Sequence, residues 1–234
     1  MSLPSPQLVL GIQLRDEASF SNYFASQANQ TAVAYLQTFL TQTQDLTAYI
    51  WSPPQQGRSH LLQACCRAAQ EKNLSAVYLP LKDLLALGPE MLQNLEHSDL
   101  VCLDDVNAIA GNKIWEEALF HLYNRLQAEQ HHLLVSAHCA PHELPFKLPD
   151  LISRLSAATV FHLQALTDNE KVSALQLHAK QRGLKLPEAV GQFLLKHIPR
   201  DNQALFETLN KLDNASFSAQ RNLTVPFVKQ VLEI

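Results

Sequence analysis

The sequence lacks the features of a membrane or exported protein. It has no apolar run of the roughly 18 residues that a membrane-spanning helix needs. Its first residues do not combine a charged segment with an apolar core, so we expect no signal peptide. These absences favour a cytoplasmic protein without membrane contact.

Basic residues are also scarce. Lys and Arg total 18 against 22 Asp and Glu, which gives a formal net charge of −4, and no stretch is dense in Lys or Arg. A protein that binds DNA strongly and without sequence preference needs such a stretch to neutralise phosphates. We therefore expect no strong direct DNA binding, and a partner that is itself a protein.

The four cysteines form no metal-binding pattern. Cys65 and Cys66 are adjacent, whereas Cys102 and Cys139 are isolated. None of these spacings is that of a metal site. We expect reduced thiols in the core, as in a cytosolic protein.

Short apolar runs are present instead. The chain has 234 residues, 47% hydrophobic and 17% charged, which is globular and long enough for two domains. Five β-like runs alternate with helical patterns, at 46–51, 76–81, 100–103, 133–137 and 159–163. Apolar strands that alternate with helices predict an α/β domain, with a five-stranded parallel sheet between helices.

Helical spacing is clear in two stretches between these runs. One covers 59–70, directly after the first run. In the other, 114–127, we expect Ile114, Ala118, Leu122 and Leu126 to form one apolar face.

After the last run only helical signals remain. Thr167 and Glu170 have the spacing of a capping box, and Gly183 is a suitable end for that helix. Pro187, Asp201 and Thr224 each mark a further helix start. The predicted organisation is an N-terminal arm (1–20), an α/β nucleotide-binding domain (21–165) and a small all-α lid (166–234).

The stretch "SPPQQGRS" between the first run and its helix is similar to a phosphate-binding loop. In such loops backbone N–H groups wrap phosphates at a helix N-terminus, a basic side chain reaches the terminal phosphates, and a hydroxyl binds Mg²⁺. The departures are serine for the first glycine, two prolines without N–H donors, and arginine for lysine. A turn without phosphate binding stays open. The candidate nucleotide-binding residues here are Ser52, Pro53, Pro54, Gln55, Gln56, Gly57, Arg58, Ser59 and His60.

A second motif favours the nucleotide site. "LVCLDDV" places Asp104 and Asp105 at the end of an apolar strand, as a Walker B element does. We expect Asp104, together with Ser59, to bind Mg²⁺, and Asp105 to polarise a water molecule. The alternative is two acids that merely end a strand.

With these motifs in place, the chain resembles the DnaA-like family of AAA+ ATPases, and within it the short members that regulate the replication initiator DnaA. The resemblance runs from about residue 7 to the end. Its most specific stretches are "QGRSHLLQA", "LVCLDDVNAIAG", "WEEALFHLYNRL", "LPDLISRL" and "LTVPFVKQVLEI".

The resemblance implies roles for four further residues. Ser136 matches the sensor 1 position, near the γ-phosphate. Gln203 stands where a sensor 2 arginine is expected, and Arg200 is a candidate replacement, with a plain surface arginine as the alternative. Arg154, in "PDLISRL", matches an arginine finger, which stabilises charge on a neighbouring protein's γ-phosphate. An ion pair with Asp150 is the alternative for Arg154.

The arm contains "QLVLGI", which resembles the short motif that binds the replicase sliding clamp. Gln7, Leu8, Leu10 and Ile12 are its anchors. A simple tail or an edge strand is the alternative. The chain also stops without the helix-turn-helix domain of the initiator, so we expect a regulator.

The implied function is negative regulation of replication initiation. A nucleotide-bound adaptor, holding ADP and Mg²⁺, would bind the clamp and stimulate hydrolysis of ATP on DnaA, near the nucleoid. The alternatives are a self-contained ATPase, with Asp105 as the base that orients the attacking water, and a DNA-bound helicase or transposase-helper loader. Base preference, oligomeric state (including a homodimer) and residual ATPase activity stay open.

Overall fold

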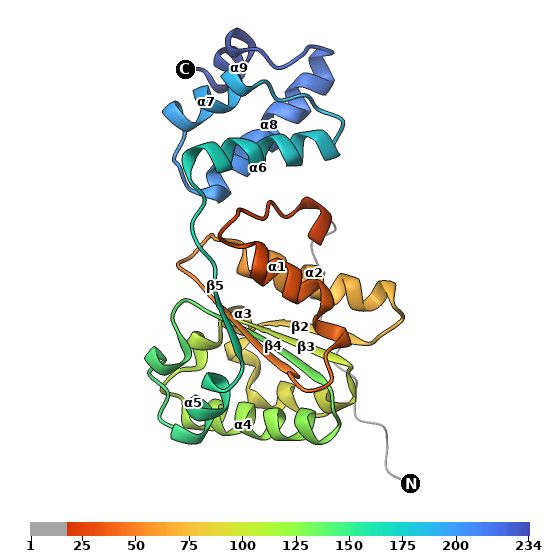
Figure 1. Cartoon of the computed structure of the whole chain (residues 1–234). Coiled ribbons are helices and arrows are strands. Elements are labelled where there is room, and N and C mark those ends of the chain that lie inside the picture. Colours follow the sequence, from red (N-terminus) through yellow and green to blue (C-terminus); the bar gives the residue numbers. More distant parts are fainter. Residues whose placement is uncertain (1–17) are drawn as a thin grey trace.

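The computed structural model describes residues 18–234 (Figure 1). The expected clamp-binding residues Gln7, Leu8, Leu10 and Ile12 lie outside this range. Within it, no helix combines the length and hydrophobicity needed to span a bilayer.

The centre of the larger domain is a five-stranded sheet with the order β2-β3-β4-β1-β5, and all four strand pairs are parallel. This confirms the predicted parallel sheet. The strands are β1 (Thr47–Trp51), β2 (Ala76–Pro80), β3 (Leu100–Asp104), β4 (His132–Ala137) and β5 (Thr159–His162).

Helices connect these strands. The α-helices are α1 (Gln30–Thr38), α2 (Arg58–Glu71), α3 (Leu81–Leu84), α4 (Lys113–Ala128) and α5 (Pro149–Ser156). The 3₁₀ turns are η1 (Phe20–Asn22), η2 (Phe39–Thr41), η3 (Leu85–Leu87), η4 (Pro89–Leu92), η5 (Leu95–His97), η6 (Val106–Ile109) and η7 (Pro141–Glu143).

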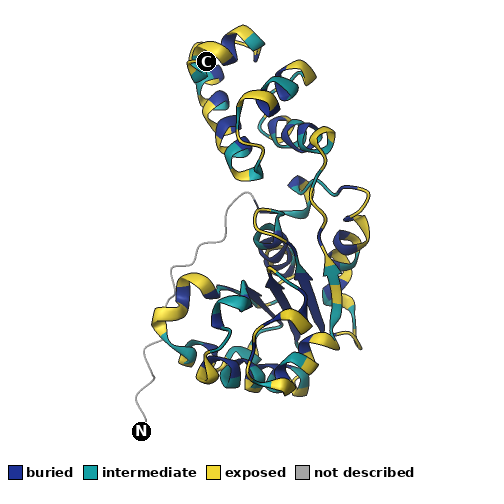
Figure 2. Ribbon diagram, turned by 90° about the vertical axis from the view of Figure 1, so that its left-hand side faces the viewer, coloured by how far each residue is buried: buried dark blue, intermediate teal, exposed yellow. Residues whose placement is uncertain are grey.

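The sheet separates two apolar cores. On one face α1 and α2 pack on Ala48 and Ile50 of β1. On the other face α3, α4 and α5 pack around Tyr49 of the same strand. Figures 1 and 2 show these two layers and the buried strands between them. Neighbouring residues of a strand point to opposite faces, so a strand that is covered on both sides is apolar at every position.

The buried face of α4 differs from the predicted one. Ile114 is 66% exposed, and the buried apolar side chains are those of Trp115, Leu119, Leu122 and Leu126. A strict four-residue step turns the position by about 40° each time because a helical turn has 3.6 residues. The observed face alternates steps of four and three and stays aligned with the core.

The last part of the chain is entirely helical, as predicted. It contains α6 (Asp168–Gln181), α7 (Glu188–His197), α8 (Asn202–Ala219) and α9 (Val225–Leu232), which share one apolar core. Thr167 and Glu170 form the predicted capping box. Asp201 and Thr224 accept hydrogen bonds from the first turns of α8 and α9. Gly183 has φ +73°, as expected of a residue that ends a helix.

Candidate nucleotide site

The loop between β1 and α2 presents a helix N-terminus at the carboxyl edge of the sheet. Ser52 is buried, and its N–H donates to the Ala137 carbonyl at 3.3 Å. Gly57, at φ +91°, precedes α2, and a Cβ there would lie 2.7 Å from Tyr23 Cε2. Both the backbone angle and the Tyr23 ring therefore require glycine. The first N–H groups of α2 lack partners within the helix, which suits an anion.

The middle of the loop is open to solvent. Pro53, Pro54 and Gln55 are exposed, and Gln56 is partly buried. Gln55 has φ +66°, and its carbonyl accepts a hydrogen bond from Asn202 Nδ2 of α8 at 2.8 Å. The lid therefore contacts the loop backbone through the side chain of Asn202, a residue that the sequence patterns did not single out.

Arg58 turns back into its own loop. Its Nη1 donates to the Ser52 carbonyl and, at 3.2 Å, to the Pro53 carbonyl. Its Nη2 donates to Asp105 Oδ1 at 2.7 Å, in an ion pair in which the Arg58 side chain is 9% exposed and that of Asp105 29%. Buried Nε has no hydrogen-bond partner in the described part of the chain. One guanidinium thus joins the loop to the end of β3.

Three residues predicted from two separate motifs meet at this ion pair, and Asp105 is one of them. Ser136, on β4, donates its hydroxyl hydrogen to Asp104 Oδ1, on β3. The same oxygen of Ser136 accepts the Asp105 N–H at 3.0 Å. Asp105 lies in the left-handed region at φ +55°, which turns the chain sharply after the strand. The structure therefore brings Ser136 and both acids together.

Tyr78, on β2, completes this arrangement, and the sequence analysis missed it. Its hydroxyl donates to Asp104 Oδ2 at 2.7 Å, and the Ser59 and Gln63 side chains lie close enough to lower its pKa. Burial, followed by the nearby Asp104 charge, raises the pKa of Tyr78, so the hydroxyl keeps its proton at neutral pH. The sequence feature that could have identified Tyr78 is its position in the apolar run 76–81, which forms the strand next to β3.

The donor set fits Mg²⁺ bound together with a phosphate. Ser59 and Asp104 offer oxygen atoms, which Mg²⁺ prefers, and Tyr78 lies beside both, with its hydroxyl bonded to Asp104. No group of three or more His, Cys, Asp or Glu residues that could hold a metal occurs within 18–234. Mg²⁺ here would therefore depend on phosphate oxygens and water for its other ligands, as is usual for this ion.

The remaining candidate residues, His60, Arg200 and Gln203, make contacts outside the loop. His60 Nε2 lies 2.9 Å from the Ser19 carbonyl, and its ring contacts Tyr23. Arg200 pairs with Asp168 at 3.0 Å, and Gln203 donates to Glu207 at 2.9 Å, both within the lid. The structure does not bring Arg200 or Gln203 to the loop.

Arg154 lies on α5, on the sheet face opposite to α2. It is exposed, and its guanidinium carbon is 5.7 Å from the centre of the Tyr123 ring. No ion pair found among residues 18–234 includes Arg154, so the alternative pair with Asp150 is not formed. The charge of Arg154 is thus available at the surface.

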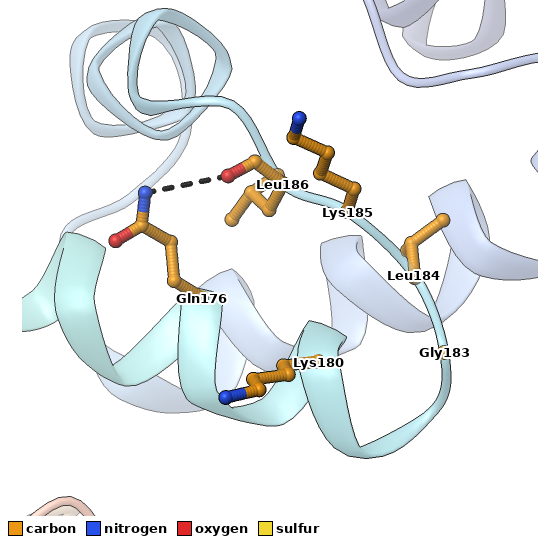
Figure 3. A pocket seen from close by; sticks show the side chains of 6 residues that line it. All are labelled: Gln176, Lys180, Gly183, Leu184, Lys185 and Leu186. Atoms are coloured by element: carbon orange, nitrogen blue, oxygen red, sulfur yellow. Dashed lines mark hydrogen bonds between the residues drawn. The ribbon is translucent and has the colours of Figure 1, made fainter.

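A cavity of about 320 Å³ in the lid is separate from these groups. Its lining residues are Gln176, Lys180, Gly183, Leu184, Lys185 and Leu186. Gln176 Nε2 donates to the Leu186 carbonyl at 3.3 Å, and the two lysine side chains extend in different directions (Figure 3). Positive charge does not converge on this cavity, so we exclude it from the candidate site.

The fold and the candidate site together define the class of protein to which this chain belongs. A parallel sheet of this order, a loop leading into a helix N-terminus after β1, an acid pair after β3 and an all-helical lid form a P-loop nucleotide-binding module of the AAA+ type.

Family comparisons identify the branch within this class. Residues 14–162, more than half of the chain, match the family model described as the bacterial DnaA ATPase domain. The chain therefore belongs to the bacterial DnaA ATPase domain family. Residues 168–232 match the lid domain of Hda. The chain is thus a Hda/DnaA-like protein related to DNA replication.

Solved structures agree on the fold. Domain III of DnaA from Thermotoga maritima has a TM-score of 0.78 at 20% identity, over 94% of this chain and 98% of that chain. AMPPCP-bound DnaA from Aquifex aeolicus has a TM-score of 0.74 at 19% identity, over 88% and 68%. The Thermotoga maritima branch migration motor RuvB has a TM-score of 0.62 at 17% identity, over 92% and 73%.

Proposed function

We propose that this protein is a negative regulator of replication initiation, which acts by stimulating hydrolysis of ATP bound to the initiator DnaA. The observation that carries the proposal is the state of Arg154. A structural arginine is normally paired with a carboxylate, whereas Arg154 is exposed, without an acidic partner in the described chain, and held only over the Tyr123 ring. Such a group can be inserted into a neighbouring protein's site.

Arg154 would act as an arginine finger in trans. Its planar guanidinium can donate two parallel hydrogen bonds to phosphate oxygens and stabilise the charge that develops there during hydrolysis. The cation–π contact with Tyr123 positions the guanidinium without neutralising its charge. Because α5 lies on the opposite face from α2, Arg154 is well placed to serve a second molecule.

The protein's own nucleotide would be a structural cofactor. ADP is our candidate, held by the loop 52–57, Arg58 and Ser59, with Mg²⁺ at Ser59 and Asp104. The N-terminal N–H groups of α2 supply the anion-binding dipole. The solved structure of AMPPCP-bound DnaA from Aquifex aeolicus supports nucleotide binding by this fold.

The arm would supply the second partner. Gln7, Leu8, Leu10 and Ile12 match a sliding-clamp motif, in which an extended peptide inserts apolar anchors into a pocket. Binding to the clamp would concentrate the regulator on replicating DNA.

The decisive test is Arg154→Ala. We expect stimulation of the DnaA ATPase to fall by roughly 10³ because a guanidinium finger contributes on that scale, while clamp binding and thermal unfolding stay unchanged. Arg67→Ala is the matched control, since Arg67 is a half-exposed arginine of α2 that pairs with Glu71. Stimulation that survives in Arg154→Ala would disprove the finger.

A second candidate is a self-contained ATPase, favoured by the meeting of Ser136, Asp104 and Asp105. Rapid ATP turnover by the purified chain without DnaA, abolished in Asp105→Asn, would establish it. Turnover seen only when DnaA is present supports the adaptor.

A further inference from the structure

Arg154 is carried by a short helix. α5 has eight residues, Pro149–Ser156, and its fully buried side chains are those of Leu151 and Leu155. A helix of about two turns is not stable by itself in water, so its contacts with the rest of the protein hold it in place. The position of the Arg154 guanidinium therefore depends on what anchors α5.

Glu116, on α4, holds the backbone where it enters α5. The side chain of Glu116 is fully buried, and its Oε2 accepts the N–H groups of Lys147 and Leu148 at 2.7 and 2.9 Å. Leu148 is the N-cap residue of α5, and leucine has no side-chain oxygen with which to cap a helix. The entry to α5 is thus fixed from another helix.

The second oxygen of Glu116 binds the turn after β3. Oε1 accepts the Gly111 N–H at 2.7 Å. In the part of the chain that the structure describes, no ion pair includes Glu116, so backbone N–H groups are what compensate its charge. Hydrogen bonds to a carboxylate are shorter and stronger than those between neutral groups. One buried side chain therefore joins α4, α5 and this turn firmly.

A small tilt at the start of α5 would move its far end. Arg154 lies six residues after Leu148, which is about 9 Å along the helix at 1.5 Å per residue. A tilt of about 10° at the first turn would therefore displace the backbone at Arg154 by about 1.5 Å. A catalytic group that is misplaced by about 1 Å can lose about 10² in rate. The contact between Arg154 and Tyr123, at 5.7 Å, supports only the last turn.

We propose that Glu116 is a positioning residue for Arg154, because it sets the angle at which α5 presents the guanidinium to a partner's phosphate. The inference rests on the proposed role of Arg154 as an arginine finger. Glu116 is fully buried and touches no substrate, so it acts only through the helix that it anchors.

The test is Glu116→Gln, which keeps the size of the side chain and replaces one accepting oxygen by an amide nitrogen. The maximal rate of hydrolysis of DnaA-bound ATP, at saturating regulator, should fall about tenfold because the finger is misplaced. The regulator concentration that gives half-maximal stimulation should change by less than about twofold, since the docking surface is kept. All rates are compared at a temperature at which circular dichroism shows each variant to be folded.

Glu117→Gln is the matched control. Glu117 is the next residue of α4, is half exposed and pairs with Lys113, so its substitution should change neither quantity. An unchanged maximal rate in Glu116→Gln would overturn the inference.

A second background tests whether Glu116 acts through the guanidinium. In Arg154→Lys the planar fork is replaced by a point charge on a flexible stem, which depends less on the angle of its helix. Adding Glu116→Gln to Arg154→Lys should therefore lower the maximal rate by less than about twofold. An equal tenfold loss in both backgrounds would show that Glu116 supports something other than the finger, and would overturn the inference.

A backbone variant provides the test if Glu116→Gln does not fold. The Lys147 side chain is exposed, so Lys147→Ala keeps the N–H that binds Glu116 and should stimulate like the wild type. Lys147→Pro removes that N–H and should lower the maximal rate at least about threefold. Equal stimulation by the two Lys147 variants would contradict the anchor.

The inference and the proposed function fail in different ways. Loss of stimulation in Arg154→Ala together with full stimulation in Glu116→Gln would reject Glu116 as a positioning residue and leave the finger standing. Stimulation that survives in Arg154→Ala would disprove the finger itself, and the inference with it.

Discussion

The loop after β1 and the helix α5 each present an arginine, and the two arginines differ in exposure and in interaction partners. Arg58 is buried, bonded to two loop carbonyls and paired with Asp105. Arg154 is exposed and lies over an aromatic ring without an acidic partner in the described chain. A guanidinium that is already paired with a carboxylate holds its own site together. A guanidinium without an acidic partner can bind a phosphate of a second molecule. In the proposed function, the nucleotide cofactor belongs to the first region and the action on DnaA to the second.

The largest expected effect is on stimulation of the DnaA ATPase and tests Arg154 on α5. Arg154→Lys keeps the charge and loses the planar fork, so stimulation of the DnaA ATPase should fall by roughly 10². Steady-state phosphate release from DnaA at saturating regulator measures it. Arg67→Lys, on the surface of α2, should have no effect. A lysine that stimulates as well as arginine would mean that charge alone is required.

The second effect concerns the support of α5. Glu116 is fully buried on α4, and its carboxylate accepts the N–H groups of Gly111, Lys147 and Leu148 at 2.7, 2.7 and 2.9 Å. Glu116→Ala leaves three buried donors without a partner and should lower the free energy of unfolding by about 3 kcal/mol or more. Urea unfolding measures this loss.

The control for Glu116 is its neighbour. Glu117 is half exposed and pairs with Lys113 at 3.5 Å, so Glu117→Ala should change stability by less than about 0.5 kcal/mol. Similar losses in both variants would contradict the role of Glu116 in holding the turn after β3 to the start of α5.

The third prediction tests the loop side of the comparison. If ADP is a structural cofactor, ADP with Mg²⁺ at 100 times its Kd should stabilise the fold by about 2.7 kcal/mol. Ser59→Ala should remove most of that gain, whereas Ser153→Ala, an exposed serine on α5, should not. Thermal unfolding with and without ligand measures it, and identical curves would show that the loop binds no nucleotide.

The smallest effect concerns Tyr78. Tyr78→Phe removes the hydroxyl that orients Asp104, so the Mg²⁺ dependence of ADP affinity should weaken about tenfold. The measurement is ADP affinity across a Mg²⁺ titration and in chelator. Tyr49→Phe, which loses a hydrogen bond to the Cys139 carbonyl instead, should behave like the wild type. An unchanged Mg²⁺ dependence in Tyr78→Phe would separate Tyr78 from metal binding.

Local patterns explain what could be predicted. Strand runs, the Thr167 capping box, Gly183 and the position of the acid pair depend on residues within one element, and the structure has them where expected. The buried face of α4 was missed at Ile114 because helical phase is set by the packing partner, which a spacing rule does not contain.

The sequence by itself determined the parallel sheet, the helical lid and the turn that leads from β1 into α2, since each follows from short-range periodicity, capping or turn chemistry. Only the tertiary structure decided that Arg58 faces Asp105, 47 residues away along the chain, that Tyr78 donates to Asp104, and that Asn202 rather than Arg200 meets the loop. These contacts join separate elements, and strand order and helix packing bring such residues together without leaving a local pattern.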